Sequence, residues 1–374
     1  MSKHARSAAV LPVDGVEQAT AEERTFPAVN PADGEVLWQV PDAGLADMDA
    51  AAAAARRAFM ETTWSTDTAL RADAIRRLQA ALADRSDDLA LLAATETGVP
   101  VALRADHLDA PIAQLRVRHP DQQAGVAVVL TPATSPFAVA IAEIGRMLVA
   151  GGTVVLKPAP EAASAALELG RIALDILPRG VLNVVTTRDV DAAIALALDP
   201  RVDEVSFTGS SVTGERVLVA AGRAGKVVRV DVGGQVPLQL TDDDDLASLV
   251  SAAALAVAAN AGQGCRLPST VVVPEHRYDE ALAAAVAAME QVAVGDPADD
   301  STLCGPVRSR VGRDRVLRYL ALARAEGGEA VLGGQPLDRA GWWVAPTVIG
   351  GLTTNSRLVR EELLGPVLMV VPDK

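Results

Sequence analysis

The sequence predicts an α/β fold built on a doubly wound parallel sheet, followed by a second α/β domain. Between residues 126 and 232, short β-rich runs alternate with helical patterns, which is typical of βαβ units. A second alternation of strands and helices follows Cys265. Ligands of parallel sheets bind at the carboxyl ends of the strands, so we expect the functional loops at those ends.

The composition argues against several classes of function. A chain of 374 residues can form two domains with sizeable cores. Its net charge of −14, without a basic stripe, argues against a nucleic-acid partner. Its two cysteines, Cys265 and Cys304, form neither a disulfide framework nor a zinc motif, so we expect no metal and a reducing, cytoplasmic setting. Asp14 interrupts any signal-peptide core, and the longest uncharged run, Leu246 to Gly264, is polar enough that we expect no membrane span.

The N-terminal part predicts a polar lead-in followed by helices. Residues 1–45 indicate an irregular or hairpin-like segment with a turn at 30–34, and we expect residues 1–28 to form a loose tail. Apolar residues at helical spacing predict helices over 50–59, 70–82 and 87–97. The polar segment that follows contains Pro100, Pro111 and Pro120, and we interpret it as a connector.

Strands and helices alternate over the rest of the chain. The predicted strands of the first sheet are residues 126–130, 153–156, 181–185, 202–207 and 227–232, and the helices between them are 137–149, 162–177, 190–198 and 212–221. A helix is expected from Leu246 onward. Later strands are predicted at 270–273, 330–332, 343–348 and 367–371, with helices at 278–289 and 308–324.

Three features of the first sheet favour a ligand at its strand ends. Lys157 follows a strand, so its ammonium group would project from the ligand-binding edge, although a lone lysine is more often simply solvated. The loop from Phe207 to Gly214 opens a helix whose amides and hydroxyls favour a phosphate, although a glycine-eased turn explains it equally well. Asp231 places a carboxylate in an apolar strand, where burial is costly without a task; the alternative is a strand-end aspartate bonded to its own turn.

Cys265 ends a small-residue turn, Asn260-Ala261-Gly262-Gln263-Gly264, rather than lying in a bulky apolar core. The two glycines free the backbone to turn. A thiolate placed among backbone N–H groups is a good nucleophile because those dipoles lower its pKa. The alternative is a buried structural cysteine that behaves as a small hydrophobic residue.

Taken in their order along the chain, the motifs resemble the aldehyde dehydrogenase superfamily, from about Asn30 to the C-terminus. The motifs that carry the resemblance are Asn30-Pro31 with Gly34-Glu35-Val36, Glu96-Thr97-Gly98, Thr131-Pro132 with Pro136-Phe137, Gly152-Thr153-Val154-Val155-Leu156-Lys157-Pro158, Phe207-Thr208-Gly209-Ser210, Asn260-Ala261-Gly262-Gln263-Gly264-Cys265, Ala345-Pro346-Thr347-Val348 and Glu361-Glu362-Leu363-Leu364-Gly365-Pro366-Val367.

The resemblance implies a Rossmann-like coenzyme-binding domain over residues 1–233 and a catalytic domain over residues 234–374. It implies oxidation of a small aldehyde to a carboxylic acid with NAD, or with NADP as the alternative. Cys265 would attack the aldehyde, Thr134 and the Cys265 N–H would hold the oxyanion, and Asp231 would activate the water that releases the acid. The residues implied to bind the cofactor are Lys157, Ser210, Gly209, Thr131, Pro132, Glu362 and Leu364.

Several positions depart from the residues usual in the family. Thr134 stands in place of an asparagine, and its shorter hydroxyl would weaken the oxyanion site. Asp231 stands in place of a glutamate, which moves the base back by one methylene group. The other changes are Ala133 for a tryptophan, Pro160 for a ribose-binding glutamate and Leu364 for a phenylalanine. We therefore expect impaired activity.

Two segments look shorter than in the family. Between Gly98 and Gly125 the chain has too few residues for the usual oligomerisation arm, so we expect a monomer or a weak homodimer. After the strand at 367–371 the chain ends, and we expect an unpaired strand edge there. Two alternatives to aldehyde oxidation stay open: a variant that passes the acyl group to coenzyme A, and a non-catalytic protein that binds a dinucleotide or a partner. The sequence does not specify the aldehyde.

Overall fold

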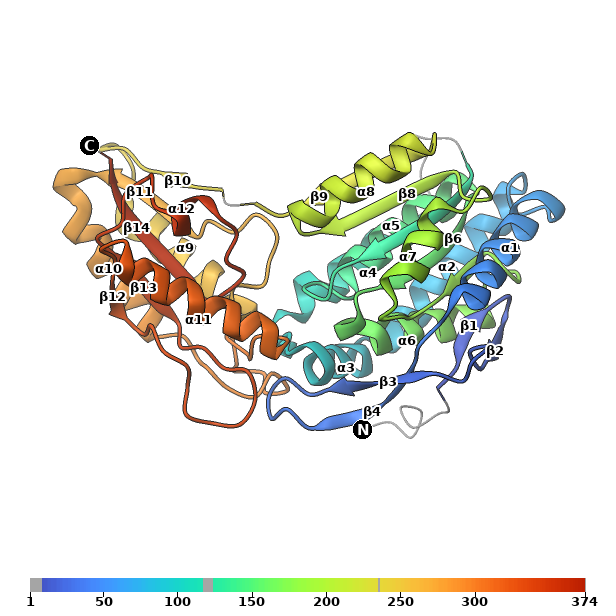
Figure 1. The fold of residues 1–374 in the computed structure, drawn as a ribbon, viewed down its shortest axis with the longest axis horizontal. Coiled ribbons are helices and arrows are strands. Elements are labelled where there is room, and N and C mark those ends of the chain that lie inside the picture. Colours follow the sequence, from blue (N-terminus) through green and yellow to red (C-terminus); the bar gives the residue numbers. More distant parts are fainter. Residues whose placement is uncertain (1–8, 117–123, 235, 374) are drawn as a thin grey trace. The chain divides into compact units, whose positions relative to one another are not determined.

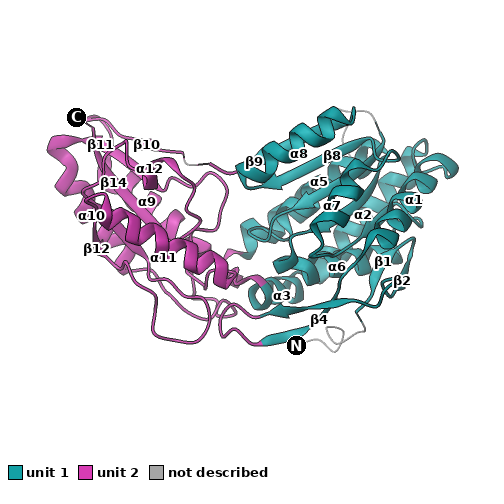
Figure 2. Cartoon of the chain, viewed as in Figure 1, with its two compact units in different colours: residues 1–29, 36–96, 104–232 teal, residues 30–35, 97–103, 233–374 magenta. Residues whose placement is uncertain are grey.

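The computed structural model describes residues 9–116, 124–234 and 236–373, which fall into two compact units (Figure 1, Figure 2). Unit 1 comprises residues 1–29, 36–96 and 104–232, and unit 2 comprises residues 30–35, 97–103 and 233–374. The assignment of coenzyme binding to residues 1–233 and catalysis to residues 234–374 remains a prediction.

Unit 1 contains a five-stranded sheet, two hairpins and most of the helices. Its strands are β1 (Leu11–Val13), β2 (Val16–Gln18), β3 (Thr25–Val29), β4 (Val36–Pro41), β5 (Val126–Thr131), β6 (Thr153–Pro158), β7 (Leu182–Val184), β8 (Glu204–Gly209) and β9 (Val227–Val232). Its helices are α1 (Leu45–Glu61), α2 (Thr68–Asp84), α3 (Ser86–Thr97), the π turn η3 (Ala105–Asp109), α4 (Ala110–Gln114), α5 (Ala138–Ala150), η4 (Pro160–Ala162), α6 (Ala163–Leu174), α7 (Val190–Leu198) and α8 (Ser211–Arg223).

The sheet of unit 1 is parallel throughout, in the order β7-β6-β5-β8-β9. The chain moves from β5 outward through β6 to β7, and then crosses back to β8 and β9. Helices α7 and α8 therefore lie on the opposite face from α5 and α6, and α1 packs with α7. The direction reverses between β5 and β8, which makes this pair the topological switch point where ligands of open α/β sheets bind. The predicted doubly wound sheet is confirmed.

The N-terminal segment is more ordered than expected. The loose tail predicted for residues 1–28 is wrong for residues 9–28, and residues 1–8 lie outside the described residues. β1 and β2 pair through Asp14 and Gly15, whose φ angles are 53° and 74°, as a two-residue hairpin turn requires. Leu11 and Val13 are buried, and β1 contacts α6 and β7. The Asp-Gly pair between apolar residues was the sequence signal for this hairpin.

The connector predicted after Gly98 is largely helical where the structure describes it. A 3-10 turn, η2 (Val101–Leu103), precedes the π turn η3 and helix α4. Leu108 and Ile112 are buried. Pro100 precedes the 3-10 turn and Pro111 lies in the first turn of α4, where proline is compatible with a helix. Residues 117–123 lie outside the described residues, and the prediction of a shortened arm falls partly on them.

Unit 2 contains a second five-stranded sheet, in the order β10-β11-β14-β13-β12, in which only β12 is antiparallel to its neighbour. Its strands are β10 (Leu238–Gln239), β11 (Thr270–Pro274), β12 (Glu329–Leu332), β13 (Thr347–Gly350) and β14 (Val367–Asp373). Its helices are η2, α9 (Leu246–Ala258), η5 (Ala259–Gly262), η6 (Glu275–Arg277), α10 (Tyr278–Glu290), α11 (Arg310–Ala325) and α12 (Arg357–Arg360).

Strand β14 separates the two cores of unit 2. Leu368 and Val370 point into a core built from α9 and α10, whereas Val367, Met369 and Val371 point into a core with α11. This alternation follows the two-residue period of a strand. Because β14 pairs with both β11 and β13, the unpaired edge expected at residues 367–371 is wrong. A parallel crossover can insert a late strand between earlier ones, which the order of the chain does not reveal.

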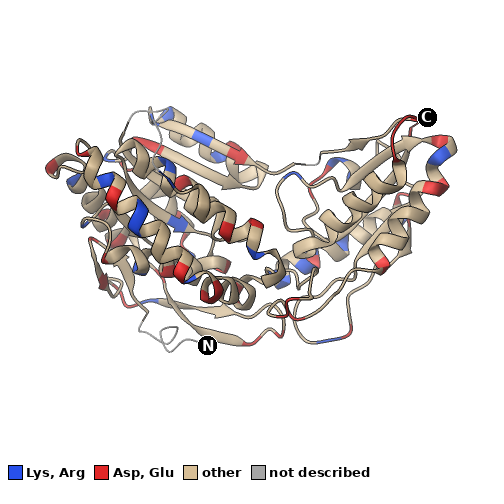
Figure 3. Cartoon of the chain, turned by 180° about the vertical axis from the view of Figure 1, so that it is seen from behind, with Lys and Arg blue, Asp and Glu red and all other residues tan. Residues whose placement is uncertain are grey.

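The surface of the described residues mixes both signs of charge. Acidic and basic residues are interspersed over the helices of each unit (Figure 3), and many form ion pairs such as Arg76 with Asp73. Exposed pairs of this kind contribute little stability. Among the described helices, none combines the length and the apolar character needed to cross a membrane.

Candidate active site

The loop that carries Cys265 is strained. We call residues 259–266 the Cys265 loop; it follows α9 and begins with η5. Asn260 and Ala261 have φ angles of 50° and 51°, and Gly262 follows with 69°. Left-handed geometry costs a non-glycine residue roughly 1–2 kcal/mol, and such strain clusters at functional sites. The sequence indicates a turn here, and an asparagine tolerates left-handed backbone, but nothing in the sequence predicts that conformation at Ala261.

Gly262 fits this loop against the Glu362 segment, which we define as residues 361–366. A Cβ atom at Gly262 would lie 1.9 Å from the carbonyl oxygen of Gly365. Leu364 in that segment also has a positive φ, 57°. Two strained backbones therefore pack directly against one another, and only glycine allows their close approach.

The buried side chain of Gln263 holds the Cys265 loop through hydrogen bonds. Its side chain is 1% exposed. Its Nε2 donates to the carbonyl oxygens of Asn260 at 3.1 Å and Pro306 at 3.2 Å. Its Oε1 accepts from the backbone N of Arg308 at 2.9 Å and from the Arg308 guanidinium at 3.3 Å. The amide is thus satisfied on both sides, as a buried amide must be.

The two cysteines differ in environment. Cys265 is exposed, whereas Cys304 is buried in the core beside α11. Burial raises the pKa of the Cys304 thiol to about 12, against a weaker opposing effect of a backbone hydrogen bond from Ala261. Cys304 is therefore an inert core residue, and Cys265 is the thiol that can act as a nucleophile.

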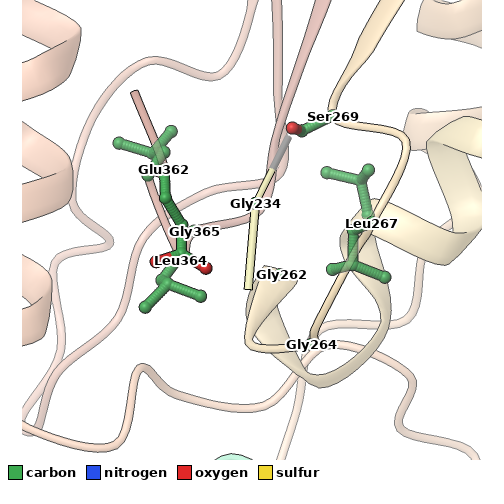
Figure 4. Close-up of a pocket in the computed structure, with 10 residues that line it drawn as sticks. Gly234, Gly262, Gly264, Leu267, Ser269, Glu362, Leu364 and Gly365 are labelled. Atoms are coloured by element: carbon green, nitrogen blue, oxygen red, sulfur yellow. The ribbon is translucent and has the colours of Figure 1, made fainter. Parts of the chain in front are cut away.

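A small, open pocket lies between the Cys265 loop and the Glu362 segment (Figure 4). Its walls come from both of these segments, from Gly234 and from the chain after Cys265. The lining residues are Gly234, Val257, Gly262, Gly264, Leu267, Ser269, Glu362, Leu363, Leu364 and Gly365. The pocket brings together two predicted cofactor residues, Glu362 and Leu364, with the neighbour of Cys265 in the chain.

Glu362 is half-buried and has two cations near its carboxylate. A Cβ atom at Gly233 would lie 2.0 Å from Glu362 Oε1, so a larger residue there would displace the Glu362 carboxylate. Burial raises the pKa of Glu362, and the charges of Arg315 and Arg308 oppose that rise. Arg315 also donates to the backbone oxygen of Glu362. Burial therefore favours the protonated form of Glu362, whereas the two guanidinium groups favour its ionised form.

The other predicted residues lie at the carboxyl edge of the sheet in unit 1. Thr131 ends β5, where it pairs with Pro158, and Lys157 pairs with Leu130 one step earlier. Gly209 ends β8 on the other side of the switch point. The remaining members of this group are Pro132, Thr134, Ser210 and Asp231.

Ser210 begins helix α8 as its N-cap. Its Oγ accepts from the backbone N of Thr213 at 3.4 Å and contacts Thr213 Oγ1 at 3.1 Å. Gly214 allows α8 to approach β9, because a Cβ atom there would lie 2.4 Å from a Val232 methyl group. Helix N-terminal amides at a switch point form an anion site of the kind that binds phosphates.

Lys157 and Thr134 are partly enclosed in the same unit. Lys157 is half-buried, and burial lowers its pKa while the charge of Glu161 opposes this effect. Thr134 is buried beyond the end of β5, and so is Ala133. The sheet therefore presents a partly desolvated ammonium group and a buried hydroxyl near its ligand-binding edge.

Asp231 is exposed in β9 and pairs with Thr208 of β8. The sequence argument assumed that this carboxylate is buried, and that assumption is wrong. β9 is an edge strand whose residues alternate between exposed and half-buried. Its position next to the end of β8 nevertheless places Asp231 in the same group as Gly209 and Ser210. Among the described residues, no cluster of three or more His, Cys, Asp or Glu side chains could hold a metal ion.

Comparison with known proteins identifies the family. Residues 18–374 match the model of the aldehyde dehydrogenase family. The chain belongs to this family. The resemblance predicted from the motifs is thereby confirmed, and the two five-stranded sheets described above are those of an aldehyde dehydrogenase fold.

Curated aldehyde dehydrogenases and solved structures of the family support this assignment. The chain is 30% identical to a betaine aldehyde dehydrogenase of Beta vulgaris and 32% identical to an aminoaldehyde dehydrogenase of Arabidopsis thaliana, in each case over 96% of this chain and 78% of the relative. It superposes with a TM-score of 0.92 on an NAD-dependent aldehyde dehydrogenase from Sinorhizobium meliloti, at 31% identity, covering 100% of this chain and 80% of that one. It also superposes with a TM-score of 0.92 on a mutant aldehyde dehydrogenase C from Pseudomonas syringae complexed with NAD+ and octanal. The identity is 30%, over 100% of this chain and 81% of that one.

The sequence missed the residues that support the Cys265 loop. Pro306 and Arg308 bond Gln263 from 43 and 45 residues away, and no local pattern marks such a contact. Gly233 and Gly234 were visible only as a glycine pair after Asp231. Their packing against Glu362 and into the pocket became apparent in the tertiary structure.

Proposed function

We propose that this aldehyde dehydrogenase family member oxidises a small aldehyde to its carboxylic acid through a covalent bond to Cys265. The observation that carries the proposal is the exposed Cys265 thiol on a strained, firmly bonded loop beside an open pocket. The buried Cys304, by contrast, is unavailable for chemistry.

The residues divide the chemistry between them. The Cys265 thiolate adds to the aldehyde carbon, and the oxygen of the resulting thiohemiacetal accepts hydrogen bonds from the Cys265 N–H and the Thr134 hydroxyl. Loss of a hydride from that carbon leaves a thioester. Asp231 then removes a proton from water, the water oxygen attacks the thioester, and the acid leaves as the thiol is restored.

The residues present fit a nicotinamide dinucleotide. Ser210 and the first amides of α8 would hold its pyrophosphate, Lys157 its adenosine ribose and Glu362 its nicotinamide ribose. Gly209, Thr131, Pro132 and Leu364 would supply the remaining contacts. When bound, NAD accepts the hydride that the substrate loses. NADP remains the alternative, because Pro160 stands where NAD-preferring members often have a carboxylate.

The test follows nicotinamide reduction at about 340 nm with a panel of small aldehydes and both cofactors. We expect slow turnover that disappears in Cys265→Ala and persists in Cys304→Ala, together with an acyl adduct on Cys265 by mass spectrometry. Absence of turnover with cofactor binding intact would favour a non-catalytic nucleotide-binding protein. Turnover that requires coenzyme A would favour the acylating alternative.

We also propose a reducing, cytoplasmic setting and a monomeric or weakly dimeric state. Two unbonded cysteines support the first, and the short stretch between Gly98 and Gly125 supports the second. Light scattering across a concentration series tests the oligomeric state, and a stable tetramer would contradict it.

A further inference from the structure

Arg308 in unit 2 bonds to Gln263 of the Cys265 loop and lies close enough to Glu362 to influence its charge. Its backbone N and its guanidinium both donate to Gln263 Oε1, at 2.9 Å and 3.3 Å. Burial raises the pKa of the Glu362 carboxyl, and the positive charge of Arg308 is one of two charges that oppose this rise. A single half-buried side chain therefore contacts the support of the Cys265 loop and influences the group predicted to bind the cofactor.

The Cys265 loop needs such a support because its own backbone is unfavourable. Asn260 and Ala261 are left-handed, and the interactions of Gln263 must offset that cost. Of the four hydrogen bonds that the Gln263 amide makes, two end on Arg308 and one on Pro306. The stretch from Pro306 to Arg308 thus anchors the Gln263 side chain of the loop.

The position of Arg308 is itself fixed by the start of α11. Ser309 is the N-cap of that helix, and its Oγ accepts from the backbone N of Gly312 at 3.2 Å. Arg315, further along α11, donates to the backbone oxygen of Glu362. One helix therefore holds the Glu362 segment through Arg315, and it holds the Cys265 loop through the residue just before its cap.

We propose that Arg308 is a positioning residue that sets the Cys265 loop through Gln263 and keeps a positive charge beside Glu362. This inference rests on the proposed function. It requires that the guanidinium, and not merely the backbone at this position, determines the reactivity of Cys265.

The test compares Arg308→Met, Arg308→Lys and the control Arg310→Met. Arg308→Met keeps the apolar stem and the backbone bond but removes the guanidinium. Arg308→Lys restores one donor and the charge. Arg310 is an exposed arginine two residues away, at the first position of α11. The first measurement is the rate of Cys265 alkylation by iodoacetamide across a pH series, without cofactor or aldehyde. The second separates kcat from the KM for NAD+.

We expect Arg308→Met to change the pH profile of alkylation and to lower kcat at least tenfold, the scale expected when a reacting group is misplaced by a fraction of an ångström. The KM for NAD+ should rise as well, Arg308→Lys should recover most of both, and Arg310→Met should match the wild type. The inference is overturned if Arg308→Met matches Arg310→Met in the alkylation profile, or if Arg308→Lys fails as fully as Arg308→Met. Because alkylation needs no turnover, it tests Arg308 even if the wild type oxidises no aldehyde.

Discussion

Glu96 caps helix α6 from a distant part of the chain: its Oε1 accepts a hydrogen bond from the backbone N of Ser164 at 2.8 Å, and its Oε2 accepts one from Ala165 at 3.1 Å. The side chain is 2% exposed. The Ser164 hydroxyl in turn accepts from Trp38 Nε1 at 2.7 Å. A buried carboxylate at a helix N-terminus satisfies amides that would otherwise lack partners.

This buried carboxyl predicts a pH-dependent contribution to stability. Burial raises the pKa of Glu96 to about 7, although its hydrogen bonds with Ser164 and Ala165 oppose the rise. Because the folded chain then binds the proton more tightly than the unfolded chain, the contribution is present at acidic pH and is lost as pH rises through about 7. Ionisation should cost about 3 kcal/mol in total.

We expect Glu96→Gln to remove this dependence. Urea unfolding between about pH 5 and pH 8 should show that the unfolding free energy of the wild type falls relative to that of the variant as pH rises. Glu61→Gln, at the exposed end of α1, is the control and should keep a constant difference. If the wild type instead gains stability relative to Glu96→Gln as pH rises, the helix N-terminus stabilises the ionised carboxylate by more than burial destabilises it.

Gly262→Ala should damage the chain far more than Gly225→Ala. Both glycines have positive φ, 69° and 73°, but a Cβ atom at Gly225 meets nothing within 4 Å, whereas at Gly262 it meets Gly365 O at 1.9 Å. We expect a loss of about 1 kcal/mol for Gly225→Ala from backbone strain alone, and at least about 3 kcal/mol for Gly262→Ala. Denaturant unfolding measures both. Equal losses of unfolding free energy in the two variants would mean that the Glu362 segment shifts at little cost to accommodate the added Cβ atom.

The native protein should offer one reactive thiol at neutral pH. Cys265 is exposed, and burial raises the pKa of Cys304 to about 12. Mass spectrometry after brief alkylation should find a single adduct on Cys265, with a second on Cys304 only in denaturant. Cys265→Ala should give no native adduct, and Cys304→Ala should still give one. Native labelling of Cys304 would show that the core beside α11 opens readily.

Thr134→Asn should raise kcat. An amide reaches further than a hydroxyl, so it restores the oxyanion donor that the family usually has at this position. Loss of such a donor costs roughly 10²–10³ in rate, and we expect a gain of at least about tenfold, with Thr134→Ala slower than the wild type. The KM for NAD+ serves as the control and should not change. A rate for Thr134→Asn at or below that of the wild type would contradict a weakened oxyanion site.

Asp231→Asn should stop the reaction after the first half. Without a base for the water, the acyl group should stay on Cys265. A rapid-mixing experiment should then show a burst of nicotinamide reduction of about one equivalent per chain, followed by little turnover. Loss of the burst as well would mean that Asp231 acts before the thioester forms.

The sequence by itself determined the family and the alternation of strands and helices in both sheets, and it singled out Cys265 as the predicted nucleophile. These features are local: a β-branched run such as Val126–Thr131 or a motif such as Gly264-Cys265 carries its meaning in neighbouring residues. The signal for the Asp14-Gly15 hairpin is equally local, because a two-residue hairpin turn favours those residue types.

Only the tertiary structure decided the central position of β14, the exposure of Asp231, and the supports of the Cys265 loop. Each depends on residues far apart in the chain. Gln263 is anchored by Pro306 and Arg308, Gly262 is limited by Gly365, and Glu96 caps a helix 68 residues away. Such contacts leave no periodic or local signal, because they are selected by packing and by the need to pair buried polar groups.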